Sequence, residues 1–311
     1  MSLQSKLPDV GTTIFTIMSR LAAEHNAINL SQGFPDFDAD PSLILAVSEA
    51  MAKGQNQYAP MPGLPDLNVA IARKLHGDYG WMPDPETEIT VTAGGTQALY
   101  SIIGAMISQG DEVIVLEPSY DSYIPSVVSF GGVVKTVQLL PPSYKVNWDE
   151  VESLITSRTK LIMINTPHNP CGVVLEQSDL HRLEEIVLKH GIYLISDEVY
   201  EHIIFDGHQH QSVLRFPELY KRSFVVFSFG KSLHVTGWKT GYVIAPPELT
   251  TELRKIHQFN VFSVNRPIQH GVAHYITHHA DFAALSSFYQ DKRDLFLKLM
   301  ILFLAQGKLQ P

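Results

Sequence analysis

The stretch Ser228–Tyr242, which reads SFGKSLHVTGWKTGY, carries the residues with the clearest chemical potential. Lys231 follows an apolar run, and Ser228 and Lys239 lie close to it along the chain. A lysine at the end of a buried strand can be desolvated enough to act as an amine nucleophile, and a nearby serine and lysine can hold a phosphate. These residues suggest a Schiff-base lysine and a phosphate cup for pyridoxal 5'-phosphate (PLP). A solvated loop with two ordinary lysines explains the stretch alone equally well.

Two other candidate groups follow predicted strands in the first half of the chain. Gly94-Gly95-Thr96-Gln97 opens a predicted helix, where free N–H groups and the positive helix end attract a phosphate. A plain strand-to-helix turn has the same sequence. Tyr120 could stack on a flat ring or be a core aromatic.

Three further candidates follow later strands. Asn169 lies in a stiff turn between two prolines, where it could bind a ligand oxygen or only close the turn. Asp197 follows an apolar run and needs a partner, which a pyridinium N–H or a basic side chain could supply. Tyr200 could donate to a phenolate oxygen. Cys171 has no His/Asp partner pattern, so we interpret it as a turn or core residue.

The elements that must position these groups alternate between short apolar strands and helices from about residue 88 onward. Such alternation predicts a mainly parallel α/β sheet covered on both faces, with ligands bound beyond the carboxyl ends of the strands. We expect Ser178 to be the N-cap of its helix and Glu185 to pair with Lys189. The predicted strands are 89–93, 113–116, 133–139, 161–164, 192–195, 224–227 and 242–245, and the predicted helices are 12–23, 41–53, 67–75, 96–107, one from about 121, 148–155 and 178–190.

Composition narrows the class of protein. The 311 residues are 45% hydrophobic and 18% charged, as expected for a soluble globular chain. The net charge of -9 argues against a nucleic-acid partner. A single cysteine fits a reducing compartment such as the cytoplasm. We find no secretory signal at the start and no membrane span, because the longest apolar run, Leu295 to Ala305, is short and contains Lys298.

Histidine is common, with 14 residues in the chain. The densest pairs are His208 with His210 and His278 with His279, but neither pair has a third ligand at a standard motif spacing. We therefore expect surface or loop histidines and no metal.

The assembled motifs resemble those of the fold-type I PLP enzymes, in particular class I/II aminotransferases of the methionine and kynurenine (glutamine-type) kind. The resemblance runs from about Leu7 to at least Arg293. It implies an N-terminal arm with part of the small domain over 1–45, a large PLP-binding domain over 46–280, and the start of a C-terminal small domain over 281–311. The motifs that carry it are NLSQGFPDF, NQYAP, TAGGTQAL, EPSYDSY, NTPHNPCG, SDEVYEH and SFGKSLHVTGWKTGY.

The resemblance also implies a role for each matched residue. Lys231 would hold PLP and act as general base and acid, and Asp197 would pair with the pyridine nitrogen. Asn169 and Tyr200 would bond the 3'-oxygen. Tyr120 would stack on the cofactor ring. The cofactor phosphate would be bound by Gly95, Thr96, Gln97, Ser228 and Lys239, and Tyr58 would reach the phosphate of the neighbouring subunit. Gly33 and Asn169 would bind the substrate carboxylate.

An amino acid and a 2-oxo acid would then react in turn, in a homodimer with shared active sites. Relatives often have arginine where Lys239 stands, which would reduce a bidentate grip to a point charge. They also continue into a domain carrying an arginine for the substrate carboxylate, and no residue here matches it. Three functions therefore stay open, namely transamination of methionine, glutamine-like or aromatic amino acids, PLP binding without turnover, and β-elimination from cysteine conjugates.

Overall fold

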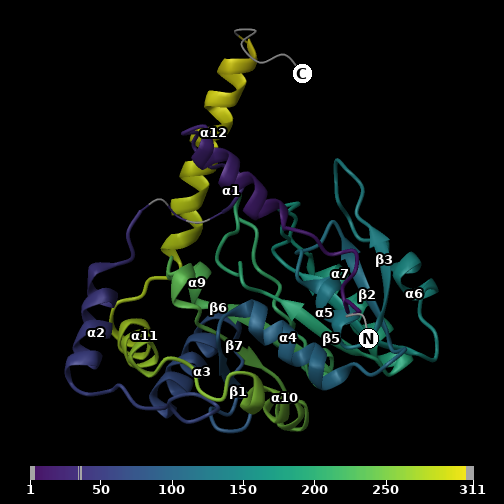
Figure 1. The fold of residues 1–311 in the computed structure, drawn as a ribbon. Helices are drawn as coiled ribbons and strands as arrows, with labels where there is room; N and C mark the ends of the chain where they lie inside the picture. Colours follow the sequence, from purple (N-terminus) through teal and green to yellow (C-terminus); the bar gives the residue numbers. More distant parts are fainter. Residues whose placement is uncertain (1–3, 34, 36, 306–311) are drawn as a thin grey trace.

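The fold is a seven-stranded sheet with helices on both faces (Figure 1), as seen in a computed structural model that describes residues 4–33, 35 and 37–305. The strand order is β1-β7-β6-β5-β4-β2-β3. All neighbours pair in parallel except β7, which runs antiparallel to both β1 and β6. The prediction of a mainly parallel α/β sheet is therefore confirmed. The strands are β1 (Ile89–Thr92), β2 (Glu112–Glu117), β3 (Val133–Gln138), β4 (Thr159–Asn165), β5 (Tyr193–Asp197), β6 (Ser223–Ser228) and β7 (Gly241–Ile244).

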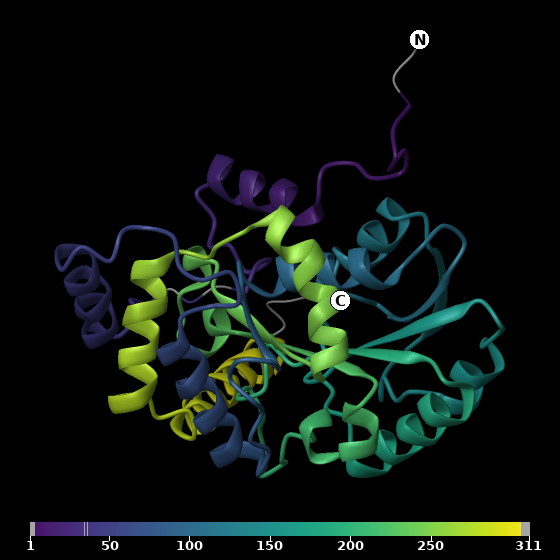
Figure 2. The same cartoon turned by 90° about the horizontal axis from the view of Figure 1, so that it is seen from below.

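Helices cover both faces of this sheet, while α1 and α12 lie outside these layers (Figure 1 and Figure 2). The first part of the chain forms α1 (Ile14–Glu24), α2 (Pro41–Ala52), α3 (Pro65–Tyr79), α4 (Gly95–Met106), α5 (Tyr123–Ser129) and α6 (Trp148–Ser153). The rest forms α7 (Gln177–His190), α8 (Pro217–Tyr220), α9 (Phe229–Ser232), α10 (Pro247–Asn260), α11 (Arg266–His278) and α12 (Ala284–Ala305), with short 3-10 turns at Val213–Arg215 and Thr236–Trp238.

Alternating side chains of the central strands build the two cores. On β6, Val225 and Phe227 belong to the cluster that includes α3 and α7, whereas Phe224 and Val226 belong to the cluster with α4 and α10. Successive residues of a strand point to opposite faces, so a fully apolar strand requires helices on both sides. Packing against helices on both faces fixes the central strands, so the carboxyl ends of the parallel strands lie together at one edge of the sheet.

The helix α7 corrects two predictions. Its N-cap is Glu176, which forms a capping box with Asp179, and not Ser178. Lys189 pairs with Glu152 at 2.6 Å instead of Glu185, because α6 places that carboxylate beside the end of α7. The N-cap correction comes from the local capping box, whereas the partner of Lys189 comes from tertiary packing that helical spacing does not reveal. No helix in the described part of the chain is long and apolar enough to cross a membrane.

The helix α12 extends away from the sheet at the end of the described chain (Figure 1). Its first half is attached to the body, since Arg293 makes a bidentate ion pair with Asp206 at 2.5 and 2.7 Å. Several apolar side chains in its second half, among them Leu295 and Ile301, are exposed.

Candidate active site

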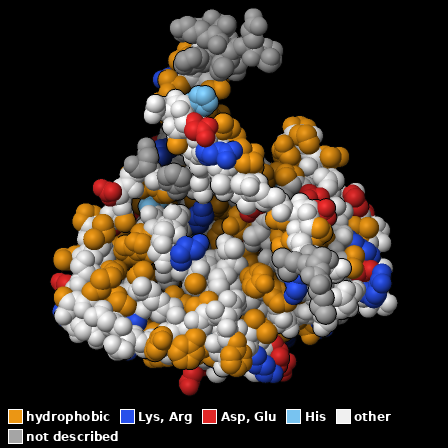
Figure 3. Space-filling view, viewed as in Figure 1, with side chains coloured by type: hydrophobic (Ala, Val, Ile, Leu, Met, Phe, Trp, Pro, Cys, Tyr) orange, Lys and Arg blue, Asp and Glu red, His pale blue; other side chains and the backbone are white. Residues whose placement is uncertain are grey.

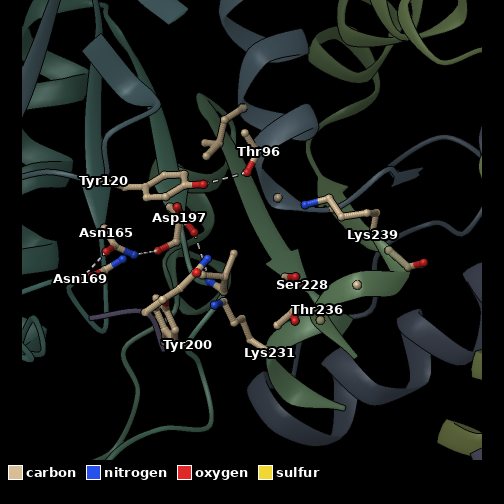
Figure 4. A pocket seen from close by; sticks show the side chains of 18 residues that line it. Thr96, Tyr120, Asn165, Asn169, Asp197, Tyr200, Ser228, Lys231, Thr236 and Lys239 are labelled. Carbon is tan, nitrogen blue, oxygen red and sulfur yellow. Dashed lines mark hydrogen bonds between the residues drawn. The ribbon is translucent and has the colours of Figure 1, made fainter. Parts of the chain in front are cut away.

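A cavity of about 330 Å³ lies beyond the carboxyl ends of the parallel strands. Seen from outside, the molecule is hollowed beneath α1, and basic side chains are visible there (Figure 3). Nine of the twelve predicted site residues line this main cavity, and they come from five strand ends (Figure 4). These nine are Gly95, Thr96, Tyr120, Asn169, Asp197, Tyr200, Ser228, Lys231 and Lys239.

One end of the main cavity suits a phosphate. The helix α4 begins at Gly95, so its free N–H groups and positive end face the cavity. Lys239 brings a cation to the same end from the turn before β7, in left-handed backbone with φ 50°. Gly94 also has a positive φ of 82°, and a Cβ there would meet the backbone of Lys239 at 3.7 Å. Ser228 adds a hydroxyl at the end of β6.

The opposite end contains a buried carboxylate. Oδ2 of Asp197 accepts a 2.6 Å hydrogen bond from the phenol of Tyr123, and Oδ1 accepts one of 3.2 Å from the N–H of Val199. Burial raises the pKa of Asp197 to about 6, and the hydrogen bond from Tyr123 opposes that rise. A cation that donates to this carboxylate would favour its ionised form.

Asparagines order the turn next to this carboxylate. Asn165 ends β4, and its Nδ2 donates to the carbonyl of Asp197 at 2.8 Å. Its Oδ1 accepts the N–H of Asn169 at 2.6 Å. Asn165 therefore ties the turn of Asn169 to the end of β5.

Lys231 lies between the two ends of the main cavity, in the short helix α9 directly after β6. Its Nζ is 5.2 Å from the centroid of the Tyr200 ring. Burial lowers the pKa of Lys231, with Asp197 opposing and Lys239 adding to the change. A larger fraction of neutral amine is what a nucleophile or general base at this position requires.

A buried ionic network supports the loop that follows Asp197. Lys74 of α3 lies 2.9 Å from both Glu201 and Asp78, and Tyr79 donates a hydrogen bond to Glu201. Although burial opposes ionisation, Lys74 helps to hold the pKa of Glu201 at about 2. Asp78, Glu201 and His202 are close enough to hold a metal ion, but Lys74 already supplies a positive charge there.

The remaining three predicted residues lie outside the main cavity. Gln97 lies in the first turn of α4, and its side chain contacts Ala93, Ser101 and His257. Only its backbone N–H therefore remains available for a phosphate. Tyr58 is 76% exposed and packs edge-to-face on Phe262 with 5.3 Å between ring centroids.

Gly33 lines a second cavity, the adjoining cavity, which shares Tyr200, Gly230, Lys231 and Thr236 with the main one. The two cavities therefore meet at the lysine. The other lining residues of the adjoining cavity are Pro35, Phe37, Ile203, Tyr289 and Lys292.

Sequence reasoning missed Tyr123, Asn165 and Thr236. Tyr123 lies three residues after Tyr120, and this closeness in the sequence was the available signal, although α5 begins only at Tyr123 and helical spacing does not link the two. Asn165 is the last residue of an apolar strand, as Asp197 is, so the same criterion of a polar residue at a strand end could have selected it.

Comparison with known proteins decides the family, because the family model described as aminotransferase class I and II matches residues 25–303. The chain belongs to the class I and II aminotransferases. Enzymes of this family transfer amino groups with PLP as cofactor, so the chain is an enzyme of the transaminase class.

Two curated aminotransferases are similar over nearly the whole chain. Methionine aminotransferase of Escherichia coli is 49% identical over 298 residues, which are 96% of this chain and 77% of that protein. Kynurenine–oxoglutarate transaminase of Dictyostelium discoideum is 35% identical over 97% of this chain and 73% of that protein. Among aminotransferase structures, that of an Escherichia coli protein with a methionine aminotransferase function superimposes with a TM-score of 0.92 at 48% identity, over 96% of this chain and 78% of that one.

Proposed function

We propose that this aminotransferase binds PLP in the main cavity and moves an amino group from an L-amino acid to a 2-oxo acid by a ping-pong mechanism. The observation that carries the proposal is the position of Lys231. Its half-buried amine, with a lowered pKa, lies between a buried carboxylate and a phosphate-sized cup. The residues at both ends fit the cofactor, because Asp197 suits a pyridinium N–H and the start of α4 suits a phosphate.

In the proposed mechanism, PLP supplies an electron sink that accepts charge from the substrate Cα. The amine of Lys231 accepts the Cα proton and later returns a proton, acting as general base and then general acid. Asp197 would hold the pyridine nitrogen and favour its protonated form. Asn169 and Tyr200 would donate hydrogen bonds to the 3'-oxygen, and Tyr120 would pack on the ring.

The phosphate contacts that we propose come from the ends of β1 and β6, which flank β7 in the sheet, and from the turn that leads into β7. Gly95, Thr96 and the backbone of Gln97 provide N–H donors, Ser228 provides a hydroxyl, and Lys239 provides the charge. Together they anchor the cofactor so that its reactive carbon stays near Lys231.

We propose that the substrate side chain is methionine, glutamine-like or aromatic. The adjoining cavity supports this, because Phe37, Tyr200 and Tyr289 give it an apolar and aromatic lining close to Lys231. The relatives named for methionine and kynurenine point the same way. Within the described residues, no arginine lines either cavity, so we assign the substrate carboxylate to the backbone of Gly33 and to Asn169.

We further propose a cytoplasmic homodimer in which Tyr58 reaches the phosphate of the neighbouring subunit. Tyr58 is well exposed, its contact Phe262 is 52% exposed, and Phe259, three residues earlier in the chain, is 87% exposed. Such apolar exposure is typical of a subunit contact. Light scattering should give the mass of a dimer, and a monomer that still binds PLP at full strength would contradict this assignment.

The visible absorption spectrum with PLP, before and after L-methionine, tests the function. A Schiff-base band that converts to the pyridoxamine form supports transamination, with Lys231→Ala as the control that lacks the band. A band indifferent to every amino acid would show cofactor binding without turnover. Pyruvate release from a cysteine conjugate would reveal β-elimination instead.

A further inference from the structure

Helix α11 presents a stripe of histidines that the transaminase site does not use. His270, His274 and His278 follow one another at four-residue spacing, and His279 is the C-cap. Residues four apart lie on the same face of a helix. The ring centroids of His274 and His278 are 4.6 Å apart, and those of His279 are 5.6 Å from His274 and 6.2 Å from His278. We call His274, His278 and His279, all exposed, the histidine cluster.

The hydrogen bonding of His278 suits a metal ligand. Its Nδ1 lies 2.8 Å from the carbonyl oxygen of His274. A carbonyl only accepts, so Nδ1 carries the proton and donates. In the neutral ring, Nε2 then has a free lone pair. Metal-binding histidines are commonly held in this way, with the second ring nitrogen donating to a carbonyl.

The surroundings of the histidine cluster are acidic. His274 and His279 line a hollow of about 420 Å³ between α2 and α11, together with Glu49 of α2. At the start of α2, Asp40 accepts a 3.1 Å hydrogen bond from Tyr275. Lys53 lines the same hollow, lies 2.7 Å from Glu49 and partly offsets its charge. Two carboxylates against one lysine leave a net negative charge beside the rings.

We propose that the histidine cluster binds one divalent transition-metal ion of the Zn²⁺, Ni²⁺ or Cu²⁺ class, with Glu49 as an additional oxygen ligand. Imidazole is a preferred ligand of these ions, at about 2.1 Å for zinc. The ligand atoms do not yet all lie within 4.8 Å of one another, so binding requires the exposed rings to turn inward. The third ligand missing from the pair His278–His279 is supplied by His274, one helical turn earlier.

Isothermal titration of the PLP-loaded enzyme with Zn²⁺, without an affinity tag, tests this site. Wild type should bind one equivalent in the micromolar range, and His274→Gln/His278→Gln should weaken binding at least tenfold. His25→Gln/His76→Gln is the matched control, because it removes two exposed histidines from other helices and should bind like wild type. None of the three clustered residues lines the main cavity, so transaminase activity should be equal in all these proteins.

Electron paramagnetic resonance with one equivalent of Cu²⁺ identifies the ligands. Coupling to two or three imidazole nitrogens in wild type, lost in the cluster variant, would support the proposal. Equal zinc affinity in wild type and the cluster variant would overturn it, as would a copper signal unchanged by the double substitution. Loss of transaminase activity would leave these metal readouts interpretable, because neither uses turnover.

Discussion

The phenol of Tyr123 donates a 2.6 Å hydrogen bond to Oδ2 of Asp197, and both side chains are buried. The carboxylate that we assign to the pyridine nitrogen of PLP is therefore partly stabilised before any cofactor binds. Tyr123 is thus a positioning residue whose effect can be measured separately from turnover.

Tyr123→Phe should weaken PLP binding about tenfold to a hundredfold, because a hydrogen bond to a charged group contributes about 1.5–3 kcal/mol. Titration of the apoprotein with PLP, followed by absorbance, measures the dissociation constant. Tyr193→Phe is the control, since it removes a hydroxyl at the opposite end of the same strand, β5. Equal affinity of wild type and Tyr123→Phe would contradict the role of Tyr123.

Asp197 should make the stability of the apoprotein depend on pH. Burial raises its pKa from 3.8 to about 6, so the folded state binds the proton more tightly than the unfolded state. The resulting stabilisation is complete below about pH 4 and is lost as the pH rises through 6. Its size is about 1–3 kcal/mol. Urea unfolding of wild type and Asp197→Asn at pH 4.5 and 7 measures how the free energy of unfolding of each protein changes with pH. The same change in both proteins would contradict a contribution from Asp197.

Lys239 should be replaceable by arginine but not by alanine. Lys239→Ala removes the only charged side chain that we assign to the phosphate and should raise the PLP dissociation constant about tenfold or more. Lys239→Arg keeps the charge and adds a bidentate donor, so it should bind PLP at least as tightly. Titration of both apoprotein variants with PLP gives the two dissociation constants. Weak binding by the arginine variant would show that the left-handed turn at Lys239 does not admit the larger group.

Lys74→Met should cost about 3–5 kcal/mol of folding free energy, because it leaves the buried carboxylate of Glu201 without its cation and also removes the partner of the partly exposed Asp78. Lys221→Met breaks an exposed pair with Glu218 and should cost less than about 1 kcal/mol. Equilibrium unfolding in urea compares them. Similar losses for both variants would mean that the network around Lys74 is not a stabilising unit.

Local patterns were sufficient to predict most elements and the strand ends that form the site. Asp197 and Lys231 could be selected as candidates because each charged residue lies at, or within three residues of, the end of an apolar strand. The partner of Lys189 and the antiparallel direction of β7 could not be predicted, since both depend on segments far apart in the sequence. Tyr123 was missed because its aromatic ring suggests core packing, and only the fold shows where its hydroxyl points.

The position of β7 also has a consequence for the order in which the chain acquires its structure. β1 pairs with β7, and no other partner of β1 is present among the described residues. Because β7 lies about 150 residues later in the chain, β1, which leads to Gly94 and Gly95, can join the sheet only after that length of chain has been made. During synthesis, Gly94 and Gly95 leave the ribosome long before Ser228 and Lys239 do. The phosphate cup that we propose can therefore form only after β7 has joined the sheet, and PLP binding should follow this late pairing.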